Sequence, residues 1–135
     1  MIFLDSSAFI SYFVSFDSNH KKAVEIFENI FSEDLVTTSD IVTETINWLT
    51  RKTHPKLIQE VGMILIEGEL ARIINISYED RLEALNTLKK YSDQKLSFTD
   101  ATSFAVIKRL EIKKVLSLDK HFNLIKGAEN LCKSS

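Results

Sequence analysis

The sequence contains very little cysteine, proline or glycine. Of its 135 residues, one is cysteine, one is proline and three are glycine. The single Cys132 cannot form an internal disulfide, so we expect a reduced, cytoplasmic setting rather than a disulfide-rich secreted domain. With so little glycine and proline, the sequence has no recognisable linker, low-complexity tract or internal repeat. We therefore expect one domain over residues 1–135.

Long apolar runs are also missing. Stretches such as Met63 to Ile66 fall far short of the roughly 20 apolar residues that span a bilayer. The N-terminus has no basic segment and reaches Asp5 almost at once, which argues against a signal peptide. The expectation is a protein that does not associate with a membrane.

The charge balance does not identify a substrate. The formal net charge is −2 and the isoelectric point is near 5.9, whereas nucleic-acid binders are usually more basic. Basic residues do occur in neighbouring pairs, at positions 21–22, 51–52, 89–90, 108–109 and 113–114. A single pair of this kind is more often part of the solvated face of a helix than part of a binding patch.

Short strands alternate with helices along the sequence. Apolar and β-branched runs predict strands at residues 1–5, 35–38, 71–76 and 114–118, with a possible edge strand near the end. Helical spacing and capping residues predict helices at about 6–14, 18–31, 40–53, 55–68, 77–91 and 100–110, and a short helix from residue 120. The expected caps include Ser39 and either Ser97 or Thr99. This alternation predicts an α/β fold with a central parallel sheet and helices on both faces.

Four acidic residues, Asp5, Glu44, Asp100 and Asp119, stand in otherwise apolar surroundings. Asp5 and Asp119 close predicted strands, and reactive groups of parallel α/β folds gather at the carboxyl ends of the strands. Glu44 and Asp100 fall on helical stretches with apolar neighbours. Buried carboxylates are costly unless a cation gathers them, and carboxylate oxygens suit Mg²⁺ and Mn²⁺. The quartet predicts a metal-dependent hydrolase that acts on phosphodiesters.

Each of the four acids also has an ordinary structural explanation. Asp5 can form a turn or cap the following helix, and Glu44 can reach past the core to solvent. Asp100 suits the first turn of a helix, and Asp119 can cap the short helix that contains His121. We expect His121 itself at the solvent edge. Four such coincidences in one chain are less plausible than one shared site.

Other catalytic motifs do not compete with the quartet. The three histidines, His20, His54 and His121, are scattered and lack ligand spacing with Cys132. The sequence has no glycine-rich phosphate loop. A phosphatase of the haloacid-dehalogenase type would carry a second aspartate two residues after the first, where this chain has Ser7.

The segments around the four acids resemble those of PIN-domain ribonucleases. The segments are Phe3 to Ala8 (FLDSSA), Thr38 to Glu44 (TSDIVTE), Leu96 to Ala101 (LSFTDA) and Leu118 to Phe122 (LDKHF). The first and last are loose motifs individually, but the set of four in this order and spacing is specific. The resemblance covers essentially the whole chain and is closest to the small stand-alone members that act as toxins in VapBC toxin–antitoxin pairs.

The resemblance implies a three-layer α/β/α sandwich and cleavage of RNA that depends on Mg²⁺ or Mn²⁺. It assigns the acidic quartet to the metal site, with Ser7 bracing the first aspartate. Asp93 could extend the acidic cluster, but an ordinary loop aspartate explains it as well. The resemblance also implies an antitoxin partner whose tail enters the acidic groove, and a homodimer formed through helices.

Other interpretations stay open at this point. An RNA- or protein-binding module could keep the same site, and an RNA-processing nuclease outside a toxin–antitoxin pair would share it. The stretch 61–66 and the pair Phe27 and Phe31 are candidates for the homodimer contact, although core packing explains both at least equally well.

Overall fold

The computed structural model describes residues 1–132, which alternate strands and helices in the predicted order. The strands are β1 (Ile2–Leu4), β2 (Leu35–Thr38), β3 (Arg72–Ile74), β4 (Lys114–Leu116) and β5 (Glu129–Asn130). The α-helices are α1 (Ser6–Phe13), α2 (His20–Ile30), α3 (Ser39–Lys52), α4 (Pro55–Ile66), α5 (Tyr78–Lys90) and α6 (Phe98–Arg109). A 3-10 helix, η1 (Lys120–Leu124), precedes β5.

The strands form one sheet in the order β3-β2-β1-β4-β5, and every neighbouring pair is parallel. The first strand of the chain is therefore the central strand, with Phe3 opposite both Val36 of β2 and Val115 of β4. Parallel neighbours cannot be joined by a tight hairpin, so the intervening helices supply the crossovers. All carboxyl ends of the strands consequently meet at one edge of the sheet.

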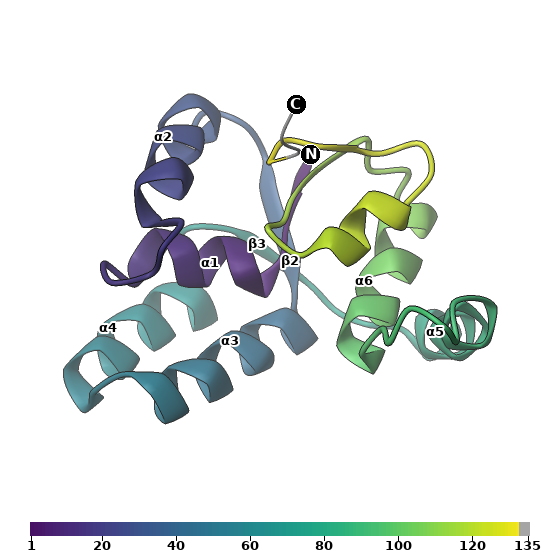
Figure 1. Cartoon of the computed structure of the whole chain (residues 1–135), viewed down its shortest axis with the longest axis horizontal. Coiled ribbons are helices and arrows are strands. Elements are labelled where there is room, and N and C mark those ends of the chain that lie inside the picture. The colour runs from purple at the N-terminus through teal and green to yellow at the C-terminus, as the bar shows by residue number, and fades with distance from the viewer. Residues whose placement is uncertain (133–135) are drawn as a thin grey trace.

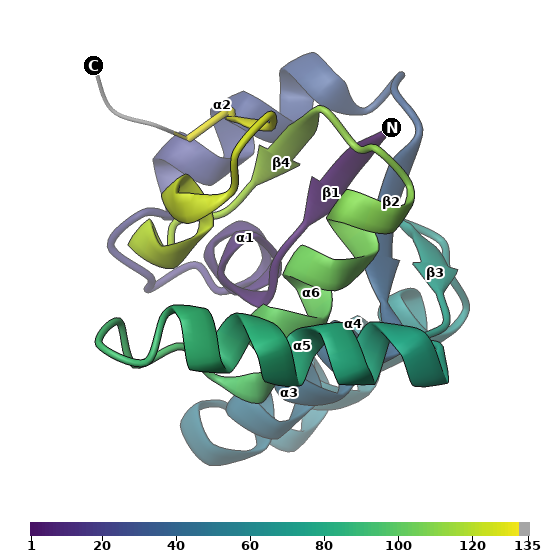
Figure 2. The same ribbon diagram turned by 90° about the vertical axis from the view of Figure 1, so that its right-hand side faces the viewer.

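Helices cover both faces of the sheet. In Figure 1 the strands overlap in the centre, with α1, α2 and α4 to their left and α5 and α6 to their right. Figure 2, turned by 90°, shows α5 and α6 in front of the strands. The central strands contribute fully buried side chains to the core, among them Phe3, Leu4, Val36, Val115 and Leu116. The predicted three-layer α/β/α fold with a central parallel sheet is confirmed.

The structure shows which residues cap the two helices that begin near the carboxyl edge of the sheet, α3 and α6. Thr38, and not Ser39, caps α3: its Oγ1 accepts a hydrogen bond from the N–H of Ile41 at 3.1 Å, and Ser39 is already helical. The physical reason is that Thr38 ends β2 with extended backbone angles, which is the conformation of an N-cap. Of the two candidate caps for α6, Ser97 holds the position and the helix begins at Phe98.

An ion pair between a buried aspartate and a partly exposed arginine fixes α6 antiparallel to α5. Asp80, in the first turn of α5, accepts hydrogen bonds at 2.9 and 2.8 Å from Arg109 at the end of α6. The Asp80 side chain is only 3% exposed, and it also completes a capping box with Ser77. A carboxylate at this depth requires its partner, so the ion pair sets how the two helices align. The start of α6, which carries Asp100, therefore lies toward the end of α5.

The apolar segments predicted as dimer contacts are divided between core and surface. The core takes up Val61, Leu65 and Phe27, whereas the exposed members are Met63, Ile66 and Phe31. Core packing accounts for the first three, and the last three stay candidates for a contact between copies of the chain. Within residues 1–132, none of the helices has the length and apolar character needed to cross a membrane.

Candidate functional site

Two of the four predicted acids follow strands that are neighbours in the sheet. Asp5 comes directly after β1, and Asp119 comes three residues after the end of β4 at Leu116. The N–H of Asp5 donates to the carbonyl of Leu116 at 3.2 Å, so the two strand ends are joined at this point. The parallel topology therefore brings positions more than a hundred residues apart to the same edge of the sheet.

Asp5 is almost completely buried, with 2% of its surface exposed. Its Oδ2 accepts hydrogen bonds from the hydroxyls of Ser7 and Ser117, both at 2.9 Å, whereas its buried Oδ1 has no hydrogen-bond partner. Burial, helped by the charge of Asp100, raises the pKa of Asp5 to about 7, although the hydrogen bonds from Ser7 and Ser117 act in the opposite direction. Asp5 makes no side-chain cap to α1, so helix capping does not explain its position.

The same two serines anchor the loop after β4. Ser7 Oγ accepts a hydrogen bond from the N–H of Leu118 at 2.9 Å, and Ser117 Oγ accepts one from the N–H of Asp119 at 3.0 Å. The position of Asp119 is thereby coupled to Asp5 through shared hydroxyls. Ser7, which the sequence predicts as a brace for Asp5, occupies that position, and Ser117 is a second brace that the sequence did not predict.

Asp100 lies in the first turn of α6, with 9% of its side chain exposed. It forms a capping box with Ser97, whose hydroxyl accepts from the Asp100 N–H at 3.0 Å and whose N–H donates to Asp100 Oδ2 at 3.4 Å. Burial raises the pKa of Asp100, and the nearby charges of Asp119 and Glu44 act in the same direction. Asp100 therefore caps α6 and is also influenced by the charges of two other predicted acids.

Glu44 enters the site from α3 and is partly buried. Its Oε2 accepts a hydrogen bond of 2.6 Å from the hydroxyl of Ser6, the first residue of α1. Ser6 directly follows Asp5 in the chain, so this bond ties α3 to the end of the central strand. The sequence did not identify Ser6 as part of the site, because its partner lies 38 residues away.

His121 lies closer to the acids than the sequence predicted. Its Nδ1 is 3.0 Å from Asp119 Oδ1 and 3.7 Å from Asp100 Oδ2, although it makes no hydrogen bond with either. The Asp119 carboxylate instead caps η1 by accepting from the His121 N–H at 2.9 Å. One potential ligand atom from each of these three residues lies within 4.8 Å of the others. The ring is 30% exposed, so it borders both the cluster and the solvent.

Asp93 is separate from this arrangement. It lies exposed in the turn between α5 and α6, and it forms no hydrogen bond or ion pair within the described part of the chain. The loop interpretation of Asp93 accounts for everything that the structure shows of it.

The donor set fits a divalent cation. Carboxylates are clustered with few compensating positive charges, and burial and mutual repulsion raise the pKa of both Asp5 and Asp100. The Asp5 Oδ1 atom is buried and unpaired, which costs free energy unless a cation or water approaches it. Hard cations such as Mg²⁺ and Mn²⁺ take carboxylate oxygens as their preferred ligands. The cluster is thus suited to bind such a metal.

A polar cleft of about 410 Å³ leads away from the acids along α3. Its lining includes Glu44, Asn47 and Arg51, which share one face of the helix, together with Thr99 of α6. Arg51 is exposed and contributes a positive charge about two turns from Glu44. Asp40 lines the same cleft, so its walls carry two carboxylates and one guanidinium.

Several solved structures are similar to this one over most of the chain. Mycobacterium tuberculosis VapC20, described as a sarcin-ricin loop cleaving toxin, has 21% identity and a TM-score of 0.84, with 91% of this chain and 93% of that chain covered. A toxin–antitoxin complex from Klebsiella pneumoniae has 18% identity and a TM-score of 0.71, covering 96% and 97%. VapBC2 from Rickettsia felis, bound to a promoter DNA fragment, has 14% identity and a TM-score of 0.66, covering 96% and 98%.

These low identities establish a shared fold and no more. Among curated proteins, none matches the sequence significantly. The family assignment instead comes from the sequence itself, because residues 2–128 match the family described as PIN domain. That match includes all four predicted acids and nearly the entire chain. The chain belongs to the PIN domain family.

Proposed function

We propose that this protein is a metal-dependent endoribonuclease and the toxin of a toxin–antitoxin pair. The observation that carries the proposal is the convergence of Asp5, Glu44, Asp100 and Asp119 on one edge of a parallel sheet. Membership of the PIN domain family supports nuclease chemistry at this edge. The structural likeness to a toxin described as cleaving the sarcin-ricin loop supports RNA as the substrate class.

In this proposal Asp5, Asp100 and Asp119 hold Mg²⁺ or Mn²⁺, and Glu44 completes the acidic set. A bound metal of this kind would lower the pKa of a water molecule and offset the charge that builds on the reacting phosphate. Ser7 and Ser117 keep Asp5 oriented through their hydrogen bonds to Oδ2, which leaves Oδ1 free to face the ion.

The surrounding residues position the RNA. Arg51 and Asn47 line the polar cleft beyond Glu44, where a guanidinium can contact phosphate oxygens. His121 borders the acids with a ring nitrogen that has no hydrogen-bond partner, so its imidazole can form a hydrogen bond with a group bound there. Asp93 has no part in this mechanism.

The proposed biological setting is cytoplasmic, with an antitoxin as partner. Similarity to the Klebsiella pneumoniae and Rickettsia felis structures supports an antitoxin as partner. An antitoxin tail with a basic side chain would complement the acidic cluster. A homodimer is part of the same proposal, with the exposed Met63, Ile66 and Phe31 as its candidate contacts.

The decisive experiment is cleavage of a mixed panel of labelled RNAs with Mn²⁺, with Mg²⁺ and with EDTA. The Asp100→Asn variant keeps the side-chain shape and removes the charge, so its rate should fall by more than the roughly 10- to 100-fold that loss of an outer-shell partner costs. Asp93→Asn is the matched control, because it removes the same charge from an exposed turn. Equal cleavage by Asp100→Asn and wild type would refute the proposed site.

A panel without cleavage would still be informative if metal binding is followed separately. Mn²⁺ should raise the melting temperature of the wild-type protein, because a ligand that binds only the folded state stabilises it. The same addition should have a much smaller effect on Asp100→Asn. A metal response without cleavage would favour a binding module that keeps the acidic site.

A further inference from the structure

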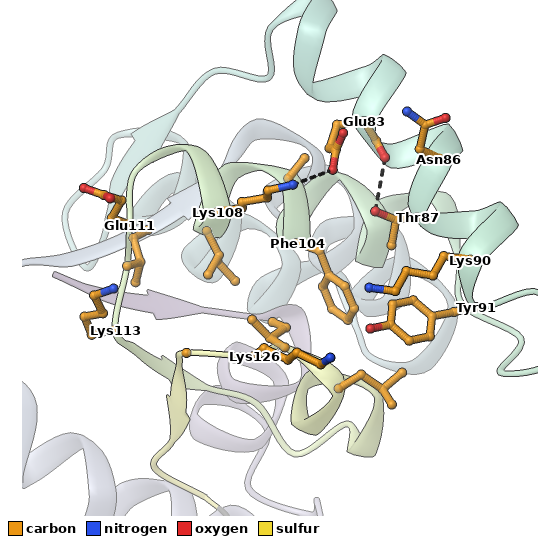
Figure 3. Close-up of a pocket in the computed structure, with 16 residues that line it drawn as sticks. Glu83, Asn86, Thr87, Lys90, Tyr91, Phe104, Lys108, Glu111, Lys113 and Lys126 are labelled. Atoms are coloured by element: carbon orange, nitrogen blue, oxygen red, sulfur yellow. Dashed lines mark hydrogen bonds and ion pairs between the residues drawn. The ribbon is translucent and has the colours of Figure 1, made fainter.

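A second cleft, of about 470 Å³, lies on the side of the sheet that α5 and α6 cover (Figure 2). One wall comes from the later turns of α5 and from α6, and the other comes from residues 124–127, which form the end of η1 and the segment that follows it. Figure 3 shows Tyr91 and Phe104 pointing into this space, with Lys90 and Lys126 on either side of them. None of these residues belongs to the acidic cluster.

The cleft begins close to the proposed catalytic edge. Phe104 follows Asp100 by four residues on α6, which is about one helical turn or 6 Å along the axis. Its ring packs edge-on against Phe122 at 5.4 Å between ring centres, and Phe122 follows His121 directly. Because α5 runs antiparallel to α6, Tyr91 at the end of α5 lies toward the start of α6. The end of the cleft with Tyr91 is therefore the end nearer to Asp100.

The lining of this cleft is positive, although the whole chain is negative. Its charged members are the lysines at 90, 108, 113 and 126 and the glutamates at 83 and 111, a balance of four against two, whereas the chain carries −2. Lys108 pairs with Glu83 at 3.1 Å on the upper rim. Figure 3 places Glu111 next to Lys113 at the far end, and the end with Tyr91 has Lys90 and Lys126 without a labelled acid.

The aromatic side chains give this positive end a second property. The Nζ atom of Lys90 lies 5.2 Å from the centre of the Tyr91 ring, and Tyr91 is only partly buried. Phe104 is 8% exposed and forms part of the floor. An aromatic ring flanked by lysines matches the way proteins bind single-stranded nucleic acids, with bases stacked on rings and phosphates near cations.

We propose that this cleft binds a nucleotide of single-stranded RNA that flanks the bond to be cut. This inference rests on the proposed function. The acidic cluster repels phosphates until metal is bound, so part of the affinity for RNA must come from residues outside the cluster. Tyr91 stacks against the base, and Lys90 and Lys126 contact the phosphates on either side of it. Since every base has an aromatic face, this subsite adds affinity with little sequence preference.

The test measures binding of fluorescein-labelled single-stranded RNA hexamers in EDTA, where cleavage is absent. Wild type is compared with Tyr91→Ala and with the double variant Lys90→Gln/Lys126→Gln. The control is Lys89→Gln/Lys56→Gln, which removes the same charge from exposed lysines outside the cleft. Tyr91→Ala should weaken binding at least about fivefold. The double variant loses two phosphate contacts, so the slope of log affinity against log salt concentration should become about 1.4 less steep. The control variant should keep the slope of the wild type.

The outcomes separate this inference from the proposed function. Equal affinity of wild type, Tyr91→Ala and the double variant overturns the inference even if metal-dependent cleavage is normal, and so does the absence of saturable binding by wild type. If the cleft instead serves an acidic peptide of a partner, the RNA affinity will be unchanged in all variants. Loss of affinity in the cleft variants alone supports the inference even if no RNA is cut. Melting curves of each variant verify that it is folded.

Discussion

Replacing Asp5 with asparagine should make the metal-free protein more stable at neutral and alkaline pH. The carboxylate of Asp5 is 2% exposed, and burial raises its pKa from 3.8 to about 7. A carboxyl group whose pKa is raised by folding binds its proton more tightly in the folded state. The protonated Asp5 therefore contributes fully to the free energy of unfolding below pH 3.8, and this contribution is lost as the pH rises toward about 7.

The magnitude follows from the interval between the two pKa values. An interval from 3.8 to about 7 corresponds to a loss of about 4 kcal/mol of unfolding free energy once the pH exceeds the folded pKa. About 3 kcal/mol of this loss falls between about pH 5 and about pH 8. Asparagine does not titrate, so the Asp5→Asn variant should lack this component. Its amide oxygen can still accept from Ser7 and Ser117, which preserves both hydrogen bonds.

The assay is urea unfolding in EDTA at several pH values between these limits. The difference in unfolding free energy between variant and wild type should grow with pH. Any difference in packing between asparagine and aspartate shifts this difference equally at every pH, so it does not change the growth. Asp93→Asn serves as the exposed control and should leave the pH dependence unchanged. Parallel curves for wild type and Asp5→Asn would refute the reasoning, because they would mean that Asp5 pays no penalty for its charge. Added Mn²⁺ should narrow the difference by stabilising the wild type.

Four further substitutions test other parts of the structure. Ser117→Ala should lower the rate of RNA cleavage by about 10- to 100-fold, because Ser117 orients both Asp5 and the loop after β4. The rate is measured at increasing concentrations of metal. Arg109→Gln removes the cationic partner of the buried Asp80 and should cost about 1 to 3 kcal/mol in urea unfolding. The exposed Arg72→Gln should cost less than about 1 kcal/mol in the same assay. Arg51→Gln should raise KM for RNA more than it lowers kcat, if Arg51 contacts a phosphate outside the reacting bond.

The positions of the four acids were readable from the sequence because local rules place them. Asp5 follows a short apolar run that predicts a strand, and parallel topology fixes the edge at which such residues emerge. Glu44 and Asp100 belong to helices that begin near the same edge, with Thr38 and Ser97 as their caps. The one-residue error at the cap of α3 arose because both Thr38 and Ser39 have suitable side chains, and only the backbone angles distinguish them.

The residues around the acids were not readable in the same way. Ser6 bonds Glu44 across 38 positions, and Ser117 bonds Asp5 across 112 positions. No helical or strand period connects residues so far apart, and serine is too common for its presence to indicate a role. His121 was assigned to the solvent edge because its neighbours in the sequence say nothing about Asp100, which approaches it from another helix.

The sequence by itself determined the order of strands and helices, the parallel sheet and the four acidic positions, because periodicity and capping act over a few residues. Only the tertiary structure decided that Ser117 shares Asp5 with Ser7, that His121 borders the acids and that Tyr91 and Lys126 face one cleft. These contacts depend on how α6, η1 and the strand ends pack against one another. Packing is set by the whole core at once, so no local segment of the sequence contains it.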